Sequence, residues 1–352
     1  MKKSLLALAV LGAFTGIASA QTSVTIYGVV DAGITREDNG SANVLRLDSG
    51  NQSGSRLGFK GNEDLGGGLS AQFLLEQGFS IDSGALGQGG LAYGRQAYLG
   101  LTGNFGQVRL GRQKTVMYDA LTAIDPFGIA VKGGIDRLFA TNTVENLNSG
   151  VGVLRGAGRA NNTIAYFTPN LSGFTGQATY SFGEVAGNNS ANRQYGLSLN
   201  YAAGPLFVTL DYLNVRNNPV APVTTQTAKT TLLGATYDFG VVKAHAAYGL
   251  DKGGPAVSAI SGTPDQRDYM VGVSVPFGAS AVQLDYVRKQ DRTSANNAGA
   301  KQYALGYTYA LSKRTNFYSS YTSTNLDAGA AYGFGIPGQK DRVLNAGIRH
   351  TF

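Results

Sequence analysis

The sequence predicts an all-β transmembrane protein, an antiparallel β-barrel of about 16 strands with an infolded third extracellular loop. Three observations predict this fold: an apolar leader, regularly spaced turns between alternating segments, and a final strand that ends on an aromatic residue. After the leader, no run approaches the roughly 20 apolar residues that a membrane-spanning helix needs. If the chain sits in a membrane, it must therefore form a closed barrel, in which every backbone polar group finds a partner.

Residues 1–20 have the pattern of a secretory signal peptide. A basic start at 1–3 precedes an apolar stretch at 5–17, and the small residues 18–20 form a cleavage site. A single membrane helix is the alternative, but the apolar stretch is short, contains two glycines and lacks a stop-transfer flank. We expect the barrel to occupy residues 21–352.

The composition agrees with many strands and tight turns. The 352 residues include 50 glycines and 19 tyrosines, with no tryptophan. The chain has no cysteine, which excludes disulfides and thiolate chemistry, and a hydrophobic fraction of 43% argues against disorder. The formal charge of +7 falls to about +5 without the two leader lysines and is not clustered, so we expect no nucleic-acid binding.

Short breaks rich in glycine, asparagine or proline organise the chain. They lie at residues 66–68, 103–106, 170–173, 204–205, 239–240, 277–278 and 311–313. Most neighbouring breaks are about 33 to 39 residues apart, which fits two strands of about ten residues, one longer loop and one tight turn. Seven such turns imply eight hairpins, and hence about sixteen strands.

The segments between the turns alternate apolar and polar side chains. In 24–34 and 207–215 one face can meet lipid while the other stays in water. Polar stretches are predicted as the external loops, at residues 36–54, 184–192, 217–229, 252–267, 291–300 and 325–341. A soluble β-sandwich could alternate similarly, but it explains neither the hairpin spacing nor the terminal Phe352.

The last ten residues predict a lipid-facing closing strand. One face carries Leu344, Ala346, Ile348 and Phe352, with His350 as its one polar interruption, and the other carries Val343, Asn345, Gly347 and Arg349.

One interval is about twice as long as the others, and its surplus lies in residues 117–158, which show little sustained alternation. A long insert of this kind is usually functional or disordered. In a wide barrel it can fold inward and narrow the lumen, which would make it a constriction loop. An external flap is the alternative.

Several motifs resemble the trimeric general porins of Gram-negative outer membranes, particularly the β-proteobacterial, neisserial-type branch. They extend from one end of the mature chain to the other, at residues 23–28, 55–61, 63–66, 103–106, 109–112, 160–162, 166–170 and 347–352. The resemblance implies a sixteen-stranded barrel with an infolded third loop, in a homotrimer whose contacts involve the first and last strands.

The resemblance also implies a charged constriction. Arg56, Arg95 and Arg159 match the positions at which such porins place wall arginines, and Asp125 matches the position at which the loop presents an acid toward them. Asp119 is a second candidate for that acid.

Energetics favours inward-facing charges, because an arginine facing lipid at mid-depth costs roughly 2 to 4 kcal/mol. Arg56 and Lys60 satisfy this rule, since Leu57 and Phe59 lie on the opposite face. Strict alternation is less favourable for Arg95, because an inward Arg95 would turn Leu99 inward as well.

We therefore expect a general diffusion porin in the Gram-negative outer membrane, surrounded by lipid and lipopolysaccharide. Arginines that face carboxylates across a waist create a transverse field, in which small hydrophilic solutes and ions diffuse passively. The three arginines and the net positive charge of the chain predict weak anion selectivity.

Three other functions remain as alternatives. An outer-membrane enzyme has little support, because His245 and His350 are the only imidazole bases and neither lies near a nucleophile motif. Two isolated histidines also make no metal cluster, so no cofactor is expected. A sugar channel would stack sugar rings on tyrosines, yet Tyr286, Tyr307, Tyr309 and Tyr321 lie toward strand ends, where interfacial girdles are expected. Adhesion through the external loops is compatible with a channel.

Overall fold

The structure is a computed structural model that describes residues 23–139, 144–145, 153–154, 158–217, 226–253, 265–293, 297–330, 332 and 334–352. The predicted signal peptide lies outside these residues, as does most of the second half of the predicted loop 117–158. No helix in the described ranges is long and apolar enough to cross a membrane.

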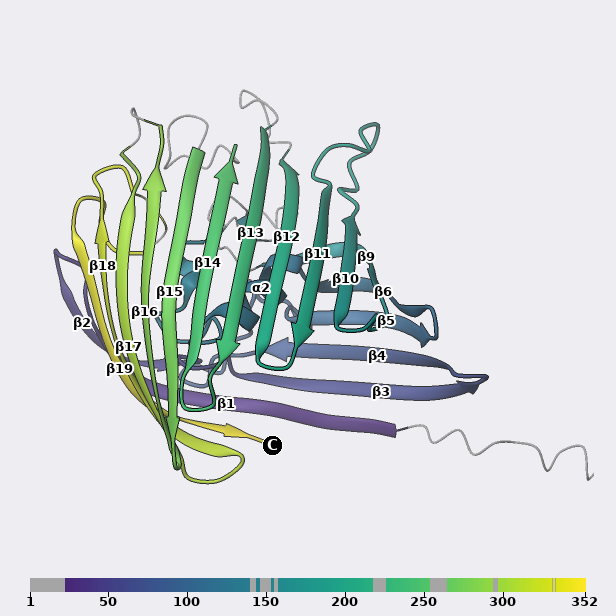
Figure 1. The fold of residues 1–352 in the computed structure, drawn as a ribbon, viewed down its shortest axis with the longest axis horizontal. Coiled ribbons are helices and arrows are strands. Elements are labelled where there is room, and N and C mark those ends of the chain that lie inside the picture. Colours follow the sequence, from purple (N-terminus) through teal and green to yellow (C-terminus); the bar gives the residue numbers. More distant parts are fainter. Residues whose placement is uncertain are drawn as a thin grey trace, which may run out of the picture.

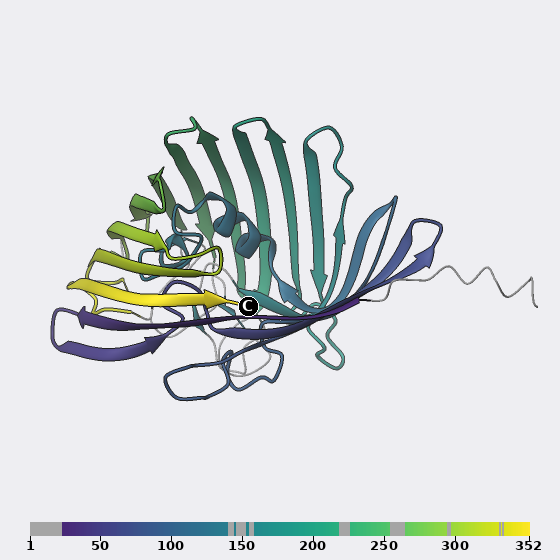
Figure 2. The same cartoon turned by 90° about the horizontal axis from the view of Figure 1, so that it is seen from below.

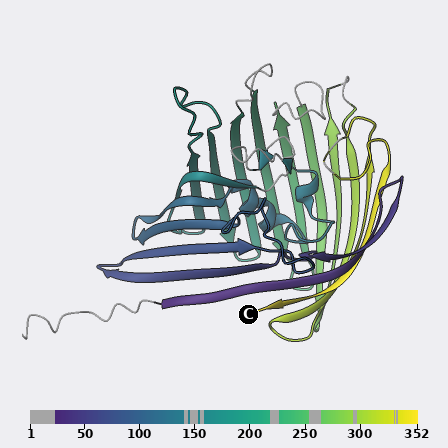
Figure 3. The same cartoon turned by 180° about the vertical axis from the view of Figure 1, so that it is seen from behind.

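The described chain is nearly all strand (Figures 1 and 3). The large sheet contains β1 (Ser23–Asp38), β2 (Asn43–Ser49), β3 (Arg56–Gly66), β4 (Leu69–Gly78), β5 (Gln96–Gly103), β6 (Gly106–Lys114), β9 (Arg159–Phe167), β10 (Phe174–Ser181), β11 (Gln194–Ala203), β12 (Leu206–Asn217), β13 (Gln226–Asp238), β14 (Lys243–Lys252), β15 (Asp265–Phe277), β16 (Ser280–Asp291), β17 (Ala300–Ala310), β18 (Thr315–Leu326) and β19 (Lys340–Thr351). Outside it are the helix α2 (Val116–Ile124), the 3₁₀ turn η1 (Ile135–Arg137) and a short pair, β7 (Val144–Glu145) with β8 (Val153–Leu154).

The sheet closes into a barrel, because β1 pairs with β19 along one edge and with β2 and β3 along the other. Beyond the end of that ladder, the backbones of Gly28 and Phe352 exchange two hydrogen bonds, of 3.1 and 3.2 Å. The large sheet has 17 strands, but β2 and β3 follow one another along the same side of β1, so they fill one position of the barrel. The predicted count of sixteen is therefore confirmed.

The seven predicted turns are confirmed, since each one joins two consecutive antiparallel strands. Figure 1 shows the tight turns of β11–β12, β13–β14 and β15–β16 at one end of the barrel and the longer connection from β10 to β11 at the other. We call the two ends the turn end and the loop end. At Gly66 the chain has a positive φ of 81°, which side-chain-bearing residues rarely adopt.

One predicted loop, 36–54, is wrong as a continuous loop. It contains β2 and a tight turn, where the Asn39 side chain accepts hydrogen bonds from the backbone of Ser41 and Ala42. Local capping of this turn lets the strands pair up to Asp38 and Asn43. The polar remainder, residues 50–55, separates β2 from β3 and forms an insert that is described with the site below.

Alternation places apolar side chains on the outer face. In β19, Leu344 is 50% exposed, whereas its neighbour Asn345 is 1% exposed. Leu210, Leu233 and Leu305 repeat the pattern on other strands. The two-faced final strand predicted from the sequence is thus confirmed.

Helix α2 and the segment after it pack on the inner face of the barrel. Figure 2 shows α2 inside the ring of strands. Thr115 caps the helix by accepting a hydrogen bond from the Tyr118 amide, and the helix buries Val116, Leu121 and Ile124 against β11 to β14. A Cβ on Gly234 would lie 2.6 Å from the Ile124 Cδ1, so glycine at this position makes room for the Ile124 side chain. The lumen therefore holds an apolar core along one side.

The two faces of β17 and β16 give a stability test. Leu305 faces outward near the middle of β17, and Gln283, paired with Gly306, faces inward on β16. Leu305→Arg should lower the free energy of unfolding by about 2 to 4 kcal/mol, because the charge meets lipid. Gln283→Arg is the matched control and should cost about 1 kcal/mol or less, because lumen substitutions are tolerated. Urea-driven unfolding from lipid vesicles measures both, and equal losses would contradict the assigned faces.

Candidate functional site

The first cluster of charged side chains lies on the inner wall and comprises Tyr27, Arg56, Glu76 and Arg95. We call it the wall cluster. The Glu76 carboxylate accepts a 2.8 Å hydrogen bond from the Arg95 Nε and another of 2.8 Å from the Tyr27 hydroxyl. The Arg56 Nε lies 3.8 Å from the same carboxylate. One acid thus holds two arginines side by side and leaves the cluster with an excess positive charge.

Tyr27 lies on β1, and three further neighbouring strands position the charged groups. Arg56 starts β3, Glu76 lies near the end of β4, and Arg95 immediately precedes β5. The Arg95 amide donates to the Glu76 carbonyl oxygen at 3.1 Å, and the Arg112 Nε donates to the carbonyl oxygen of Gly94 at 2.8 Å. These bonds fix the bend that carries the Arg95 side chain.

The register expected for Arg95 needs correction. Arg95 is 7% exposed and pairs with Glu76 in the lumen, yet Leu99 is 60% exposed on the outer face. Both are possible because Arg95 lies outside the strand, so alternation along β5 does not govern its direction. An inward Arg95 therefore does not turn Leu99 inward.

A second cluster, which we call the helix cluster, joins β6 and the start of β9 to the first turn of α2. It comprises Arg109, Lys114, Tyr118, Asp119 and Arg159. The Lys114 Nζ lies 3.6 Å from the Asp119 carboxylate. The charges of Lys114 and Arg159 lie over the Tyr118 ring, at 4.7 and 4.9 Å from its centroid. Asp119 also interacts electrostatically with Arg109 and Arg159. The helix therefore presents an aromatic ring and an acid to a cationic stretch of wall.

Asp125 has a different environment. Its carboxylate accepts hydrogen bonds from the backbone amides of Phe127, Ile129 and Ile135, at 3.1, 2.7 and 3.2 Å. Among the described residues, no ion pair joins it to an arginine. Both carboxylate oxygens are thus used to fold the segment that follows α2.

The insert at residues 50–55 is anchored to β1 by one buried acid. The Asp31 carboxylate accepts from the amides of Gln52 and Ser53, at 2.8 and 2.6 Å, and from the Tyr318 hydroxyl at 2.6 Å. The carbonyl oxygen of Asn51 in turn accepts from the Val131 amide at 2.6 Å. The insert therefore ties the wall to the segment that follows α2.

His245 also contacts the end of α2. Its Nδ1 lies 2.8 Å from the Ile124 carbonyl oxygen, and its Nε2 lies 3.2 Å from the Ser274 hydroxyl. Being 6% exposed on the inner face, it serves as an anchor for the helix rather than as an accessible base.

The structure brings together most of the predicted site residues. Arg56 and Arg95 meet through Glu76. Arg159 lies over the Tyr118 ring and interacts electrostatically with Asp119. Lys60 lies four residues after Arg56 along β3, toward the turn end, with its Nζ 5.5 Å from the Tyr27 ring centroid.

The sequence analysis did not single out Tyr27, Asp31, Glu76 and Tyr118. Applied to every strand, the rule that charges face inward would have found Glu76 and Asp31. The described residues contain no group of three or more side chains suited to holding a metal ion.

The environment of Asp125 predicts a pH dependence. Burial raises the pKa of its carboxyl to about 7, and nearby Asp136 adds to the rise, while the three amide donors oppose it. The folded segment thus binds the proton more tightly than an unfolded one, and this stabilisation is lost as the pH rises through about 7.

Residues 126–139 should therefore exchange amide hydrogens at least about tenfold more slowly at pH 5 than at pH 8, after correction for intrinsic rates. Hydrogen-exchange mass spectrometry measures this ratio. In Asp125→Asn the corrected ratio should fall to about one; a ratio that persists would assign the effect to the other acids that face the segment, Asp136 and Asp285.

Comparisons with known proteins agree with this architecture. Residues 7–329 match the family model described as Gram-negative porin. The chain is 36% identical to outer membrane porin protein 32 of Delftia acidovorans, with full coverage of both chains. It is 28% identical to the major outer membrane protein P.IB of Neisseria meningitidis serogroup B, with 90% and 91% coverage.

Among solved structures, the fold is similar to one titled anion-selective porin from Comamonas acidovorans. The TM-score is 0.80 at 32% identity, over 94% of this chain and 100% of that one. The closed barrel and the family match lead to the same conclusion: the chain belongs to the Gram-negative porins, which are channel proteins of the outer membrane and not enzymes.

Proposed function

We propose that this porin is a general diffusion channel with weak anion selectivity, and that its waist lies between the wall cluster and the helix cluster. The pairing of the charged side chains is the observation that supports this proposal. Glu76 holds Arg56 and Arg95 on the wall. Helix α2 brings Asp119 to Lys114 and Arg159. The predicted loop 117–158 acts as the constriction loop through its first half.

The charge count supports the sign of the selectivity. Together the two clusters hold five cationic side chains and two acidic ones, which leaves a net charge of +3. Such a potential raises the local concentration of anions and lowers that of cations. The solved porin from Comamonas acidovorans is itself described as anion-selective, which supports the proposal by similarity.

Passage is passive and favours small hydrophilic solutes. Charges on two sides of a waist create a transverse field that orients water and polar solutes, and an apolar solute would have to displace that ordered water. The partners are thus inorganic anions and small polar solutes, without a cofactor or a nucleic acid.

The outer face favours lipid and a homotrimer. Val24 and Ile26 on β1 are more than 60% exposed, and Leu45 on β2 is 72% exposed, which suits contact with other copies of the chain. Elsewhere, Tyr303 is 53% exposed and stacks against Tyr286 at 4.9 Å, as expected of an interfacial girdle. Lipopolysaccharide is the partner proposed for the loop-end rim.

The tyrosines argue against a sugar-specific channel. Tyr307, Tyr309 and Tyr321 are all more than 40% exposed, on the same face as Leu305. Rings on the outer face cannot stack on a sugar inside the lumen.

Neutralising the three predicted wall arginines tests the proposal. The Arg56→Gln, Arg95→Gln, Arg159→Gln variant should still conduct, but its reversal potential in a salt gradient should move from the anion side to zero or to the cation side. Single-channel recording of the purified protein in a planar bilayer measures both quantities.

Arg292→Gln is the control, because Arg292 lies at the loop end and is 43% exposed beside Asp265. It should leave the reversal potential unchanged. No conductance from the folded wild-type protein would overturn the proposed function, and an unchanged reversal potential in the triple variant would overturn the waist.

Glu76 gives a test in the opposite direction. Glu76→Gln removes the acid shared by Arg56 and Arg95, so the net charge of the two clusters becomes +4 and anion selectivity should increase. The increase should shrink at 1 M salt, where the Debye length is about 3 Å. Glu63→Gln, at an exposed position of β3, is the matched control. A shift toward cations in Glu76→Gln would contradict the assigned role.

A further inference from the structure

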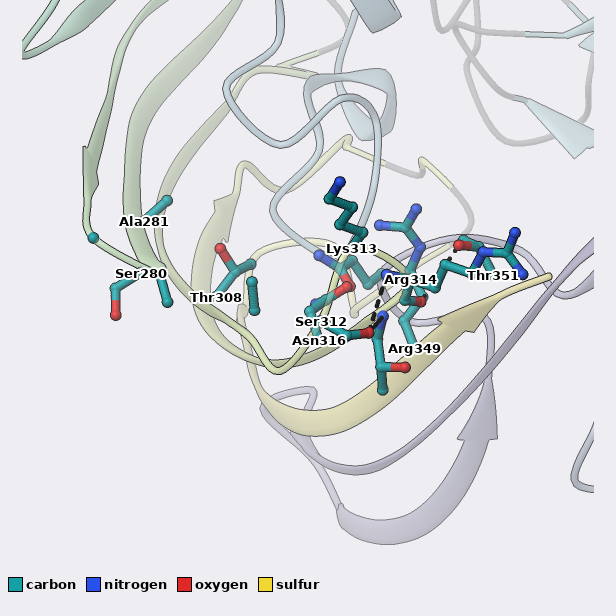
Figure 4. A pocket seen from close by; sticks show the side chains of 14 residues that line it. Ser280, Ala281, Thr308, Ser312, Lys313, Arg314, Asn316, Arg349 and Thr351 are labelled. Atoms are coloured by element: carbon teal, nitrogen blue, oxygen red, sulfur yellow. Dashed lines mark hydrogen bonds between the residues drawn. The ribbon is translucent and has the colours of Figure 1, made fainter.

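A pocket at the turn end of the lumen lies apart from both clusters (Figure 4). It has a volume of about 380 Å³ and is formed by the β15–β16 turn, the β17–β18 turn, the end of β19 and Gln52 of the insert. Its wall includes Ala281, Thr308 and Asn316, which lie on the face opposite the exposed Tyr307, Tyr309 and Phe317. The pocket therefore opens to the lumen and not to lipid.

Three cationic side chains line this pocket. Lys313 and Arg314 come from the β17–β18 turn, and Arg349 comes from β19 directly opposite Asn316. Figure 4 shows the three side chains gathered on one side of the pocket, with Ser280, Ala281 and Thr308 on the other. Within the described part of the chain, no ion pair involves any of the three.

The surroundings leave hydrogen-bond donors for a ligand. The Asn316 side chain donates to the Gln52 Oε1 at 2.8 Å, so the Gln52 amide NH₂ remains a donor. The Ser312 hydroxyl accepts from the amides of Arg314 and Thr315, at 3.2 and 3.1 Å, so its own proton points elsewhere. Cations and donors with few acceptors are the chemistry that recognises an oxyanion.

Asp31, the acid that interacts with Arg349 of the pocket, already has hydrogen-bond partners of its own. Arg349 interacts electrostatically with Asp31, but the Asp31 carboxylate accepts three hydrogen bonds, from the insert and from Tyr318. Arg349 also interacts electrostatically with Arg56 of the wall cluster. The pocket thus stays positive, and Arg349 couples it electrostatically to the wall cluster.

We propose that this pocket is a binding site for a small oxyanion of the inorganic phosphate class, formed by Lys313, Arg314 and Arg349 with Gln52 and Asn316. An anion that leaves the waist near Arg56 meets Arg349 next. The pocket would then be a second anion-binding site on the path through the channel, at its turn-end mouth. The proposal that phosphate binds depends only on the residues of the pocket. The proposed role of this binding site in anion passage rests on the proposed function.

Binding is tested with the purified full chain in detergent, by titrating inorganic phosphate and following its ³¹P resonance. The Lys313→Gln, Arg314→Gln, Arg349→Gln variant should raise the half-saturating phosphate concentration at least tenfold. Lys243→Gln is the matched control, because Lys243 is also at the turn end but lines a different pocket with Asp238. Arg56→Gln, Arg95→Gln, Arg159→Gln should retain binding.

Two results would overturn the site: no saturable phosphate binding to the wild-type chain, or binding that survives in the pocket variant and disappears in the waist variant. Where the triple pocket variant fails to fold, the three single variants replace it, each with an expected rise of several-fold.

The transit role has a separate readout. Phosphate added on the turn-end side should reduce the chloride current of wild type and of Lys243→Gln, but not that of the pocket variant. If the wild-type protein binds phosphate but does not conduct chloride, the binding site is supported and the proposed channel function is overturned. If the pocket variant conducts chloride and phosphate reduces its current equally from both sides, the proposed role of the pocket in anion passage is overturned.

Discussion

Backbone hydrogen bonding in a bilayer is the constraint on which the rest of this structure depends. Lipid offers no partner to an unpaired N–H or C=O, so the sheet must close, and it does so where β1 meets β19. Closure gives every strand one face in lipid and one in the lumen. Apolar residues such as Leu305 then occupy the outer face, while charged groups such as Glu76 and Asp31 gather inside.

A barrel of this width leaves an interior that side chains of the wall alone do not fill, and the chain fills part of it with its own loop. Helix α2 lays its apolar face on β11 to β14, where glycine at 234 makes room for Ile124. His245 contacts the Ile124 carbonyl oxygen at the end of α2, and the insert at 50–55 accepts a hydrogen bond from the Val131 amide in the segment that follows. The remaining lumen has a wall-cluster side and a helix side, and the geometry of the proposed waist follows from that division.

Shared acids organise the charges of the lumen. Glu76 holds two arginines, Asp31 holds the insert, and Asp125 folds the segment after α2. Each carboxylate is satisfied by several donors, which makes it a positioning group for the cations or backbone around it. The cations outnumber the acids at the two clusters, and three further cationic side chains line the turn-end pocket.

The sequence by itself determined the barrel, the strand number, the turns and the outward face of β19, because hairpin spacing and period-two alternation are local properties of the chain. The resemblance also predicted Arg56, Arg95 and Arg159 as constriction arginines and Asp119 as one of two candidate acids. Only the tertiary structure decided that Glu76 joins Arg56 to Arg95, that Asp125 serves its own segment, and that residues 50–55 form an insert anchored by Asp31. Those contacts join strands distant in sequence or depend on a bend outside a strand, where alternation no longer sets the direction of a side chain.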